Sequence, residues 1–578
     1  WSPPRVPVRR PWLTVRSSRR LMCLLATSIL VAGCSLLPGD GDSPQDPPSA
    51  RVPDLTPVGW EPVDRERVAA GGTLRLATPA LPENFNPQHS SNGESEVDRL
   101  LDPTVGSAVR ITADGGWEVD PDYAREVEIV DRKPLTIRVE MNRKAVWQDG
   151  TPIVARDMVA FWKAQNGSDP KFEVRSTQGF DEIDDVTPDG KFAYTVTFDA
   201  PTTDWPRYIY PALPASVSDE AETFNAAFAD RPIPSNGPFR VASIDRDTGQ
   251  VVQERNPQWW GTKPRLKQIT WQAATPEIQL EALRAGDLDA TDVSSSQLAD
   301  IDDAELDEDV VVQRATGTEW TQLTMNGAAG PLKDVAVRRA VALALDRRAL
   351  ADALTKPLGT PSQVLGSFVL LPGQRGYVDQ SDLIAPDVAK AGQLLDDAGW
   401  EMADTGTVRT LKGKALTLDM PVPAKTSTSR TRAAMIADQL AEVGIKVTLQ
   451  TVPDDEFFTN RIIPLDFDLA TFTHQGGAFP VVDTKRLFYP IDSGQNFTGV
   501  EDDKLASVWD KAISALDDDD RAKAIEVLDK RLFGDVPLVP LGVVPQFWLT
   551  NRSIANYGPA QFLGPDWTSV GFRAAAGD

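Results

Sequence analysis

Units made of a helix, a glycine and a strand recur along this chain, and they constrain its fold more than any other feature. In the unit at 432–449, apolar residues first recur at helical spacing, Gly444 then interrupts the pattern, and apolar residues finally alternate as in a strand. The helical positions are Ile436, Leu440 and Val443, and the strand positions are Ile445, Val447 and Leu449. A similar unit spans 276–290, with Gly286 between its halves. Repeated units of this kind predict α/β lobes.

Alternating segments elsewhere predict half-buried strands. Apolar residues occupy every second position from Leu135 to Met141 and again from Tyr194 to Phe198. Helical spacing reappears at Val337, Val341, Ala344 and Leu345. The chain has 578 residues, which is more than a single hydrophobic core usually organises, so we expect more than one lobe.

Charge and the scarcity of cysteine and histidine exclude several functions. The formal net charge of -25 disfavours nucleic acid and anionic lipid as partners and fits a soluble monomer. Cys23 and Cys34 both lie in the amino-terminal stretch, and His89 and His474 are the only histidines. The folded body therefore lacks the ligands of a zinc site and the parts of a Cys/His nucleophile pair. We expect no metal, no other cofactor and no catalysis.

The amino-terminal stretch has the features of a bacterial export signal. Six arginines precede an apolar run from Leu21 to Gly33 that is too short to span a bilayer. The run ends in Val-Ala-Gly-Cys, which resembles the lipobox whose cysteine receives a diacylglycerol. We therefore predict a signal peptide at 1–33 and an acylated (palmitate-type) anchor at Cys34, which would hold the protein on the extracytoplasmic face of the cell membrane.

The residues that follow predict a flexible tether at 34–70. They are rich in Pro, Asp, Gly and Ser and show neither a strand nor a helix period. The folded body is expected to begin near Gly71.

Several segments along the chain together match the pattern of a known family. The most telling segment is 135–162, in which a strand is followed by Trp147, Asp149, Gly150 and then a helix. Supporting matches are GGTLRLATP at 71, GPFRV at 237, RNPQWWG at 255, LRAGDLDA at 283, DVAVRRAVALALDR at 334, IADQLAEVGIKV at 436 and VPLVPL at 536. In their order and spacing these segments resemble the oligopeptide, dipeptide and nickel binding proteins of ABC importers, solute-binding protein family 5. Asp149 and Gly150 favour a tight turn, and Asp157 lies in the first helical turn, so we expect these residues and Trp147 to be scaffold.

The resemblance implies an α/β, two-lobed, periplasmic-binding-protein-like fold (type II, cluster C) that engulfs its ligand by hinge closure. The implied parts are lobe one at 71–273 with an extra subdomain at about 113–190, lobe two at 274–543, and a return to lobe one at 544–578. The chain would cross the hinge near Trp271 and again near Gly542. The implied partners are a peptide-like or other small organic ligand and the permease subunits of an ABC importer.

One segment departs from the peptide-binding members of that family. They carry a carboxylate after the strand that lies here within 467–480, and it holds the peptide's free amino group. Gln475, Gly476 and Gly477 stand at that place. A buried ammonium without a carboxylate costs roughly several kcal/mol, so free-amino peptides are less expected. This segment and 553–558 look closer to actinobacterial lipoproteins that include the mycobacterial one linked to phosphatidylinositol mannoside and lipoarabinomannan synthesis.

Seven residues are candidate ligand contacts: Phe85, Asn86, Trp320, His474, Gln475, Phe479 and Trp548. His474, Gln475 and Phe479 share a loop at the carboxyl end of a strand, where open α/β sheets place ligands. Trp320 is expected to face that loop across the cleft, with core packing as an equal alternative. Phe85 and Asn86 follow the first strand and have the same alternative, and Trp548 has a structural role as its alternative.

Two functions follow from these observations. The first is a binding lipoprotein that delivers a solute to an ABC importer, as the lipobox, the tether and the two-lobed pattern suggest. The second is a regulatory lipoprotein of the same fold in cell-envelope glycolipid synthesis. The missing carboxylate at Gln475 to Gly477 favours the second.

Overall fold

The computed structural model describes residues 55–92, 96–299, 301, 306–402, 406–500 and 502–574. The predicted signal peptide and Cys34 lie outside these residues. The folded body begins before Gly71, because the Gly59 N–H donates to the Pro559 carbonyl at 2.8 Å and the Asn556 side chain bonds the backbone of Val63. The predicted tether was therefore too long. The carboxyl-terminal segment of the chain binds the last part of the predicted tether and fixes its conformation. Amino-acid composition alone does not reveal this distant partner.

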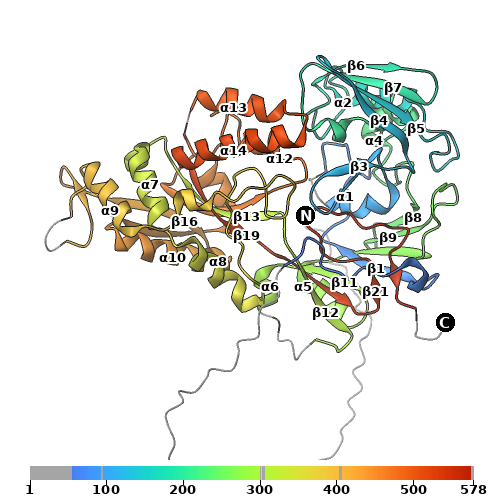
Figure 1. Cartoon of the computed structure of the whole chain (residues 1–578). Helices are drawn as coiled ribbons and strands as arrows, with labels where there is room; N and C mark the ends of the chain where they lie inside the picture. The colour runs from blue at the N-terminus through green and yellow to red at the C-terminus, as the bar shows by residue number, and fades with distance from the viewer. Residues whose placement is uncertain are drawn as a thin grey trace, which may run out of the picture. The chain divides into compact units, whose positions relative to one another are not determined.

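The first lobe is built on a four-stranded sheet in the order β1-β10-β9-β8, of which Figure 1 labels β1, β8 and β9. The strands are β1 (Thr73–Thr78), β8 (Phe239–Asp245), β9 (Gln250–Arg255) and β10 (Gln268–Ala273). β1 and β10 run parallel, and the other pairs are antiparallel. Leu74, Ile269 and Trp271 are buried, so this sheet carries the core of the lobe.

An extra subdomain lies between β1 and β8 in the chain and contains an antiparallel sheet in the order β4-β5-β7-β6. Its elements are β4 (Ala124–Arg132), β5 (Leu135–Met141), α2 (Ala155–Gln165), β6 (Ile183–Pro188) and β7 (Ala193–Phe198). Every second residue of β5 is buried, which confirms the predicted alternation. The predicted end at residue 190 was too early, because β7 pairs with both β5 and β6 and completes the sheet.

The corner between β5 and α2 has the scaffold role that the sequence predicted. Gly150 adopts a φ of 84°, which suits glycine in a tight turn. The Asp157 carboxylate accepts hydrogen bonds from the Val154 N–H at 2.8 Å, the Trp147 Nε1–H at 3.3 Å and the Ala215 N–H at 2.8 Å. One side chain therefore fixes the start of α2, the neighbouring loop and a fully buried tryptophan ring.

The second lobe contains a three-stranded sheet in the order β18-β13-β19 and a parallel pair, β16-β17. Its strands are β13 (Glu319–Met325), β16 (Thr417–Pro423), β17 (Lys446–Val452), β18 (Leu469–Gln475) and β19 (Leu538–Val543). Its main helices are α7 (Val335–Ala344), α8 (Arg347–Thr355), α9 (Val388–Asp397), α10 (Ser427–Glu442), α13 (Lys504–Ile513) and α14 (Asp518–Asp535). Gly444, at φ 80°, joins α10 to β17 and confirms the predicted helix, glycine and strand unit.

The first crossing between the lobes was predicted in the wrong place. Trp271 lies inside β10, with β1 on one side and β9 on the other, so the chain stays in the first lobe there. It continues through α5 (Pro276–Arg284), β11 (Ala290–Val293) and β12 (Val310–Ala315). Both of these strands pair with β20 (Gln546–Asn551), and Arg75 of β1 binds Asp289. The chain crosses at 316–318, between β12 and β13.

The return crossing at 544–545, between β19 and β20, lies close to the predicted Gly542. The two crossings touch, because a Cβ atom at Gly317 would lie 2.0 Å from the carbonyl oxygen of Val544. The amino-terminal segment also reaches this point, where the Thr316 N–H donates to the Thr56 carbonyl at 2.9 Å. Three chain segments therefore meet where the lobes join.

Candidate ligand-binding site

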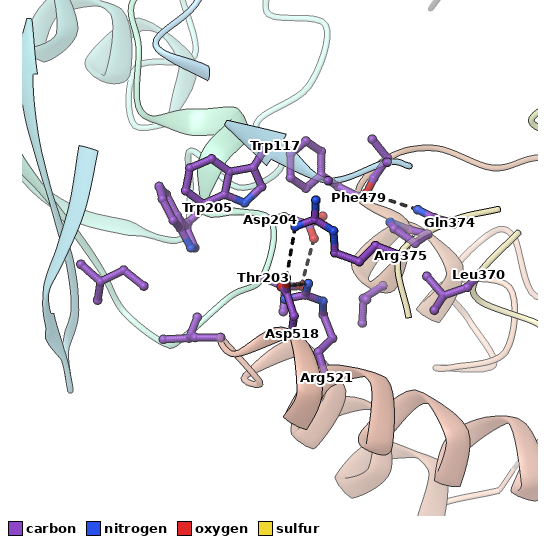
Figure 2. A pocket seen from close by; sticks show the side chains of 17 residues that line it. Trp117, Thr203, Asp204, Trp205, Leu370, Gln374, Arg375, Phe479, Asp518 and Arg521 are labelled. Atoms are coloured by element: carbon purple, nitrogen blue, oxygen red, sulfur yellow. Dashed lines mark hydrogen bonds and ion pairs between the residues drawn. The ribbon is translucent and has the colours of Figure 1, made fainter. Parts of the chain in front are cut away.

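A cavity of about 190 Å³ lies between the two lobes (Figure 2). On the first lobe it borders the side that carries the extra subdomain. Its first-lobe wall consists of residues around β3 (Trp117–Val119) and of the loop that follows β7. Its second-lobe wall comes from 370–375, the start of α12 (Pro480–Lys485) and the start of α14. Figure 2 shows Trp117 and Trp205 on one side, Leu370 and Gln374 on the other, and Arg375 between them.

Polar contacts between the lobes surround this cavity. Arg375 Nε lies 3.0 Å from an Asp114 carboxylate oxygen, and the Arg375 N–H donates to the Asp114 carbonyl at 2.8 Å. The hydrogen bond from the Thr112 hydroxyl and the pairing with Arg375 lower the pKa of Asp114 to about 2. Further ion pairs join Arg132 to Asp517 and Arg207 to Asp483. Water and salt screen exposed ion pairs of this kind, so they hold the lobes together only weakly.

Phe479 is the predicted contact that lines the cavity. It is half-buried and immediately precedes α12, where the chain leaves the end of β18. Gln475 lies at the end of the same strand but is exposed, and its Nε2 donates to the Thr318 hydroxyl at 2.5 Å. Gln475 therefore fastens the end of β18 to the first crossing.

The sequence suggested that Trp320 and His474 face each other across a cleft, but the structure places them side by side within one sheet. They are opposite residues on the paired strands β13 and β18, and their ring centroids are 4.9 Å apart. Trp320 is buried in the core of the second lobe, which favours its packing alternative. His474 also contacts the Phe472 ring, and this apolar burial lowers the pKa of His474 to about 4.

Phe85, Asn86 and Trp548 lie away from the cavity. Phe85 and Asn86 are fully buried in the first lobe, and the Asn86 side chain donates to the Phe224 carbonyl at 3.0 Å. Trp548 packs its ring against Tyr557 and lies under the Arg99 guanidinium. Each of the three side chains therefore packs against other parts of the protein, and none of them lines this cavity.

Sequence reasoning missed most of the cavity wall. Trp117, Asp204, Trp205, Arg375 and Arg521 all line it. These residues come from four segments that are far apart in the chain. The only local signals were an aromatic residue after the Gly115-Gly116 turn and the polar-aromatic pair at 204–205, and neither is specific.

The fold and cavity define a class of protein, and comparison with known families identifies it. The family model for bacterial extracellular solute-binding proteins, family 5 (middle region), matches residues 118–499. This span covers more than half of the chain. The protein therefore belongs to solute-binding protein family 5, and the predicted two-lobed α/β fold is confirmed.

Relatives of this chain are described as binding proteins. The oligopeptide-binding protein OppA of Mycobacterium tuberculosis (strain H37Rv) is 31% identical over 574 residues, which cover 97% of this chain and 95% of OppA. The probable monoacyl phosphatidylinositol tetramannoside-binding protein LpqW of the same strain is 26% identical over 77% of this chain and 71% of LpqW. The structure of the periplasmic EDTA-binding protein EppA superposes with a TM-score of 0.77 at 26% identity, covering 88% of this chain and 98% of EppA.

Within the described ranges, three or more His, Cys, Asp or Glu side chains do not gather in a way that could hold a metal ion. No helix there has both the length and the apolar character needed to cross a membrane.

Proposed function

We propose that this protein captures a peptide-like solute between its two lobes and delivers it to the permease of an ABC importer. The observation that carries the proposal is the aromatic and charged cavity between the lobes, in a chain that matches an oligopeptide-binding protein over nearly its full length. The cavity is smaller than the 300 to 1,000 Å³ or so of typical ligand sites, so it would hold one end or one side chain of a ligand.

A binding experiment with a random pool of di- to pentapeptides tests this function. Peptides retained by the natively purified protein are identified by mass spectrometry, and their affinities are then measured by calorimetry. We expect Phe479→Ala to weaken binding about tenfold or more, because truncating a buried aromatic anchor commonly costs about 1 to 3 kcal/mol. Phe458→Ala is the matched control, since Phe458 is 43% exposed and lies outside the cavity. Equal affinities for wild type and Phe479→Ala would remove Phe479 from the site.

The second candidate is a regulatory lipoprotein that binds a cell-envelope glycolipid. This candidate is favoured by the absence of a carboxylate at Gln475, Gly476 and Gly477. It is disfavoured by the comparison of relatives, because the chain is 26% identical to LpqW and 31% identical to OppA. Permease and ATPase genes next to this gene would support the importer. A mannosylated lipid retained by the natively purified protein, with no peptide retained, would support the regulator.

We further propose that Cys34 carries the lipid anchor, and the apolar run before it supports this assignment. Cys34→Ala is expected to release the protein from the membrane fraction without changing its thermal unfolding. Labelling cells with a fatty-acid probe measures this directly. Membrane retention of the variant, together with an unlabelled wild type, would contradict the proposal.

A further inference from the structure

Asp204 is a buried carboxylate on the wall of the cavity, and one of its oxygens lacks a hydrogen bond. The residue is 1% exposed. Its Oδ1 accepts a hydrogen bond from the Thr203 hydroxyl at 3.2 Å. Its Oδ2 accepts none from the residues that the structure describes. A buried carboxylate is normally paired or fully hydrogen-bonded, because its desolvation is otherwise costly.

The counter-charge near Asp204 is incomplete. Arg207 Nη1 lies 3.8 Å from Oδ2, but it lies closer, at 3.3 Å, to Asp483. Burial raises the pKa of Asp204 to about 7; Arg207 opposes this shift, whereas the charges of Asp483 and Glu182 add to it. The carboxyl group therefore lacks a positive partner within hydrogen-bond distance among the described residues.

The other cations of the cavity wall are already engaged. Arg375 pairs with Asp114 and with Asp518, and Arg521 pairs with Asp518. Among the described residues, neither arginine forms an ion pair with Asp204. The cavity wall thus carries two arginines and two aspartates, and both arginines are engaged by carboxylates other than that of Asp204.

Aromatic rings complete the surroundings. The ring centroids of Trp117 and Trp205 are 5.0 Å apart in an edge-to-face arrangement, and both residues line the cavity (Figure 2). Phe479 lines it from the second lobe. Aromatic faces attract organic cations, most strongly where water is excluded. An acidic oxygen that can accept a hydrogen bond and rings that favour positive charge are therefore found in one small space.

We propose that Asp204 accepts a hydrogen bond from a protonated amine of the ligand, with Trp117, Trp205 and Phe479 packed around the alkyl group that carries it. This inference rests on the proposed function, because it takes the cavity as the ligand site. The bound group would be a primary or secondary ammonium. Asp204 would supply, from the first lobe, the carboxylate that is absent at Gln475 to Gly477 in the second.

The consequence is that the two lobes contribute different contacts to one small group. Asp204 and both tryptophans belong to the first lobe, and Phe479 belongs to the second. An ammonium bound by Asp204 would be enclosed only when the lobes are together. Binding of the amine would then favour the closed arrangement, as a ligand favours whichever state it contacts best.

Ligand-dependent thermal shifts with n-butylammonium chloride test the proposal at constant ionic strength. The neutral control is 1-butanol, which has the same number of heavy atoms. We expect n-butylammonium to raise the melting temperature of the wild type and 1-butanol not to do so. In Asp204→Asn the apparent affinity for the amine should fall at least tenfold. The matched variant, Asp517→Asn, removes an exposed interlobe carboxylate outside the cavity and should behave like wild type.

A second measurement avoids dependence on one variant. Because Asp204 holds a proton for part of the time near pH 7, amine binding at that pH should release protons, and calorimetry of the wild type in two buffers of different ionisation enthalpy measures this release. The proposal is overturned if n-butylammonium does not bind, if 1-butanol binds equally well, if Asp204→Asn retains full affinity, or if no proton is released. Peptides that bind equally well with free and with acetylated amino groups would overturn this inference and leave the proposed function intact.

Discussion

Trp147→Ala is expected to lower the free energy of unfolding by about 3 to 5 kcal/mol, the usual cost of truncating a fully buried large aromatic residue. The ring is 2% exposed, so its loss opens a cavity in the subdomain core. It also removes the Nε1–H donor from Asp157, the carboxylate that caps α2. Chemical denaturation monitored by circular dichroism measures the change.

Trp147→Phe separates the two causes. It keeps most of the ring volume but removes the hydrogen bond to Asp157, and we expect it to cost about 1 to 3 kcal/mol. Ligand affinity in the folded fraction should be the same as in the wild type for both variants. A variant that stays as stable as the wild type but loses affinity would show that Trp147 belongs to the site and not to the scaffold.

The second large effect is a pH-dependent loss of stability that originates at His474. Burial lowers the pKa of this residue to about 4 in the folded state, whereas an unfolded histidine titrates near 6.5. The unfolded chain therefore binds the proton first as the pH falls. The contribution of neutral His474 is fully present above about pH 6.5 and is lost progressively towards pH 4, by about 2 to 3 kcal/mol.

Comparison with His474→Gln isolates this contribution. Asp204 and Asp529 have pKa values raised by burial to about 7, so they act in the opposite sense and stabilise the folded state as the pH falls. The whole-protein profile is the sum of such contributions. The difference in unfolding free energy between wild type and His474→Gln should therefore fall between pH 7.5 and pH 4.5. A difference that is constant with pH would mean that His474 titrates normally in the folded protein.

Local patterns predicted the elements well because their physical causes are local. The alternation in β5 follows from one buried face, and Gly444 ends α10 because it adopts a positive φ that few other residues tolerate. The turn at Gly150 and the cap at Asp157 depend on neighbours within ten residues. Each of these features could be predicted from a short stretch of sequence.

Long-range pairing was the part that sequence could not give. The position of the first crossing depends on β12 pairing with β20, a strand more than 200 residues later in the chain. The cavity depends on the same kind of contact, because Trp117, Asp204 and Phe479 meet only after the lobes have formed. Phe479 could be anticipated from its place after a strand. Asp204 has no comparable signal, since a single aspartate before a tryptophan is common in surface loops.

The contact between Gly317 and Val544 determines what kind of motion the join between the lobes can allow. At this point the clearance between the two backbones is about that of a hydrogen atom, since even a methyl carbon at Gly317 would lie 2.0 Å from the Val544 oxygen. Two crossing segments in such close contact can twist about each other, but a sideways slide would drive one backbone into the other. The join between the lobes therefore permits rotation of one lobe relative to the other but opposes translation. After each rotation the two walls of the cavity return to the same alignment.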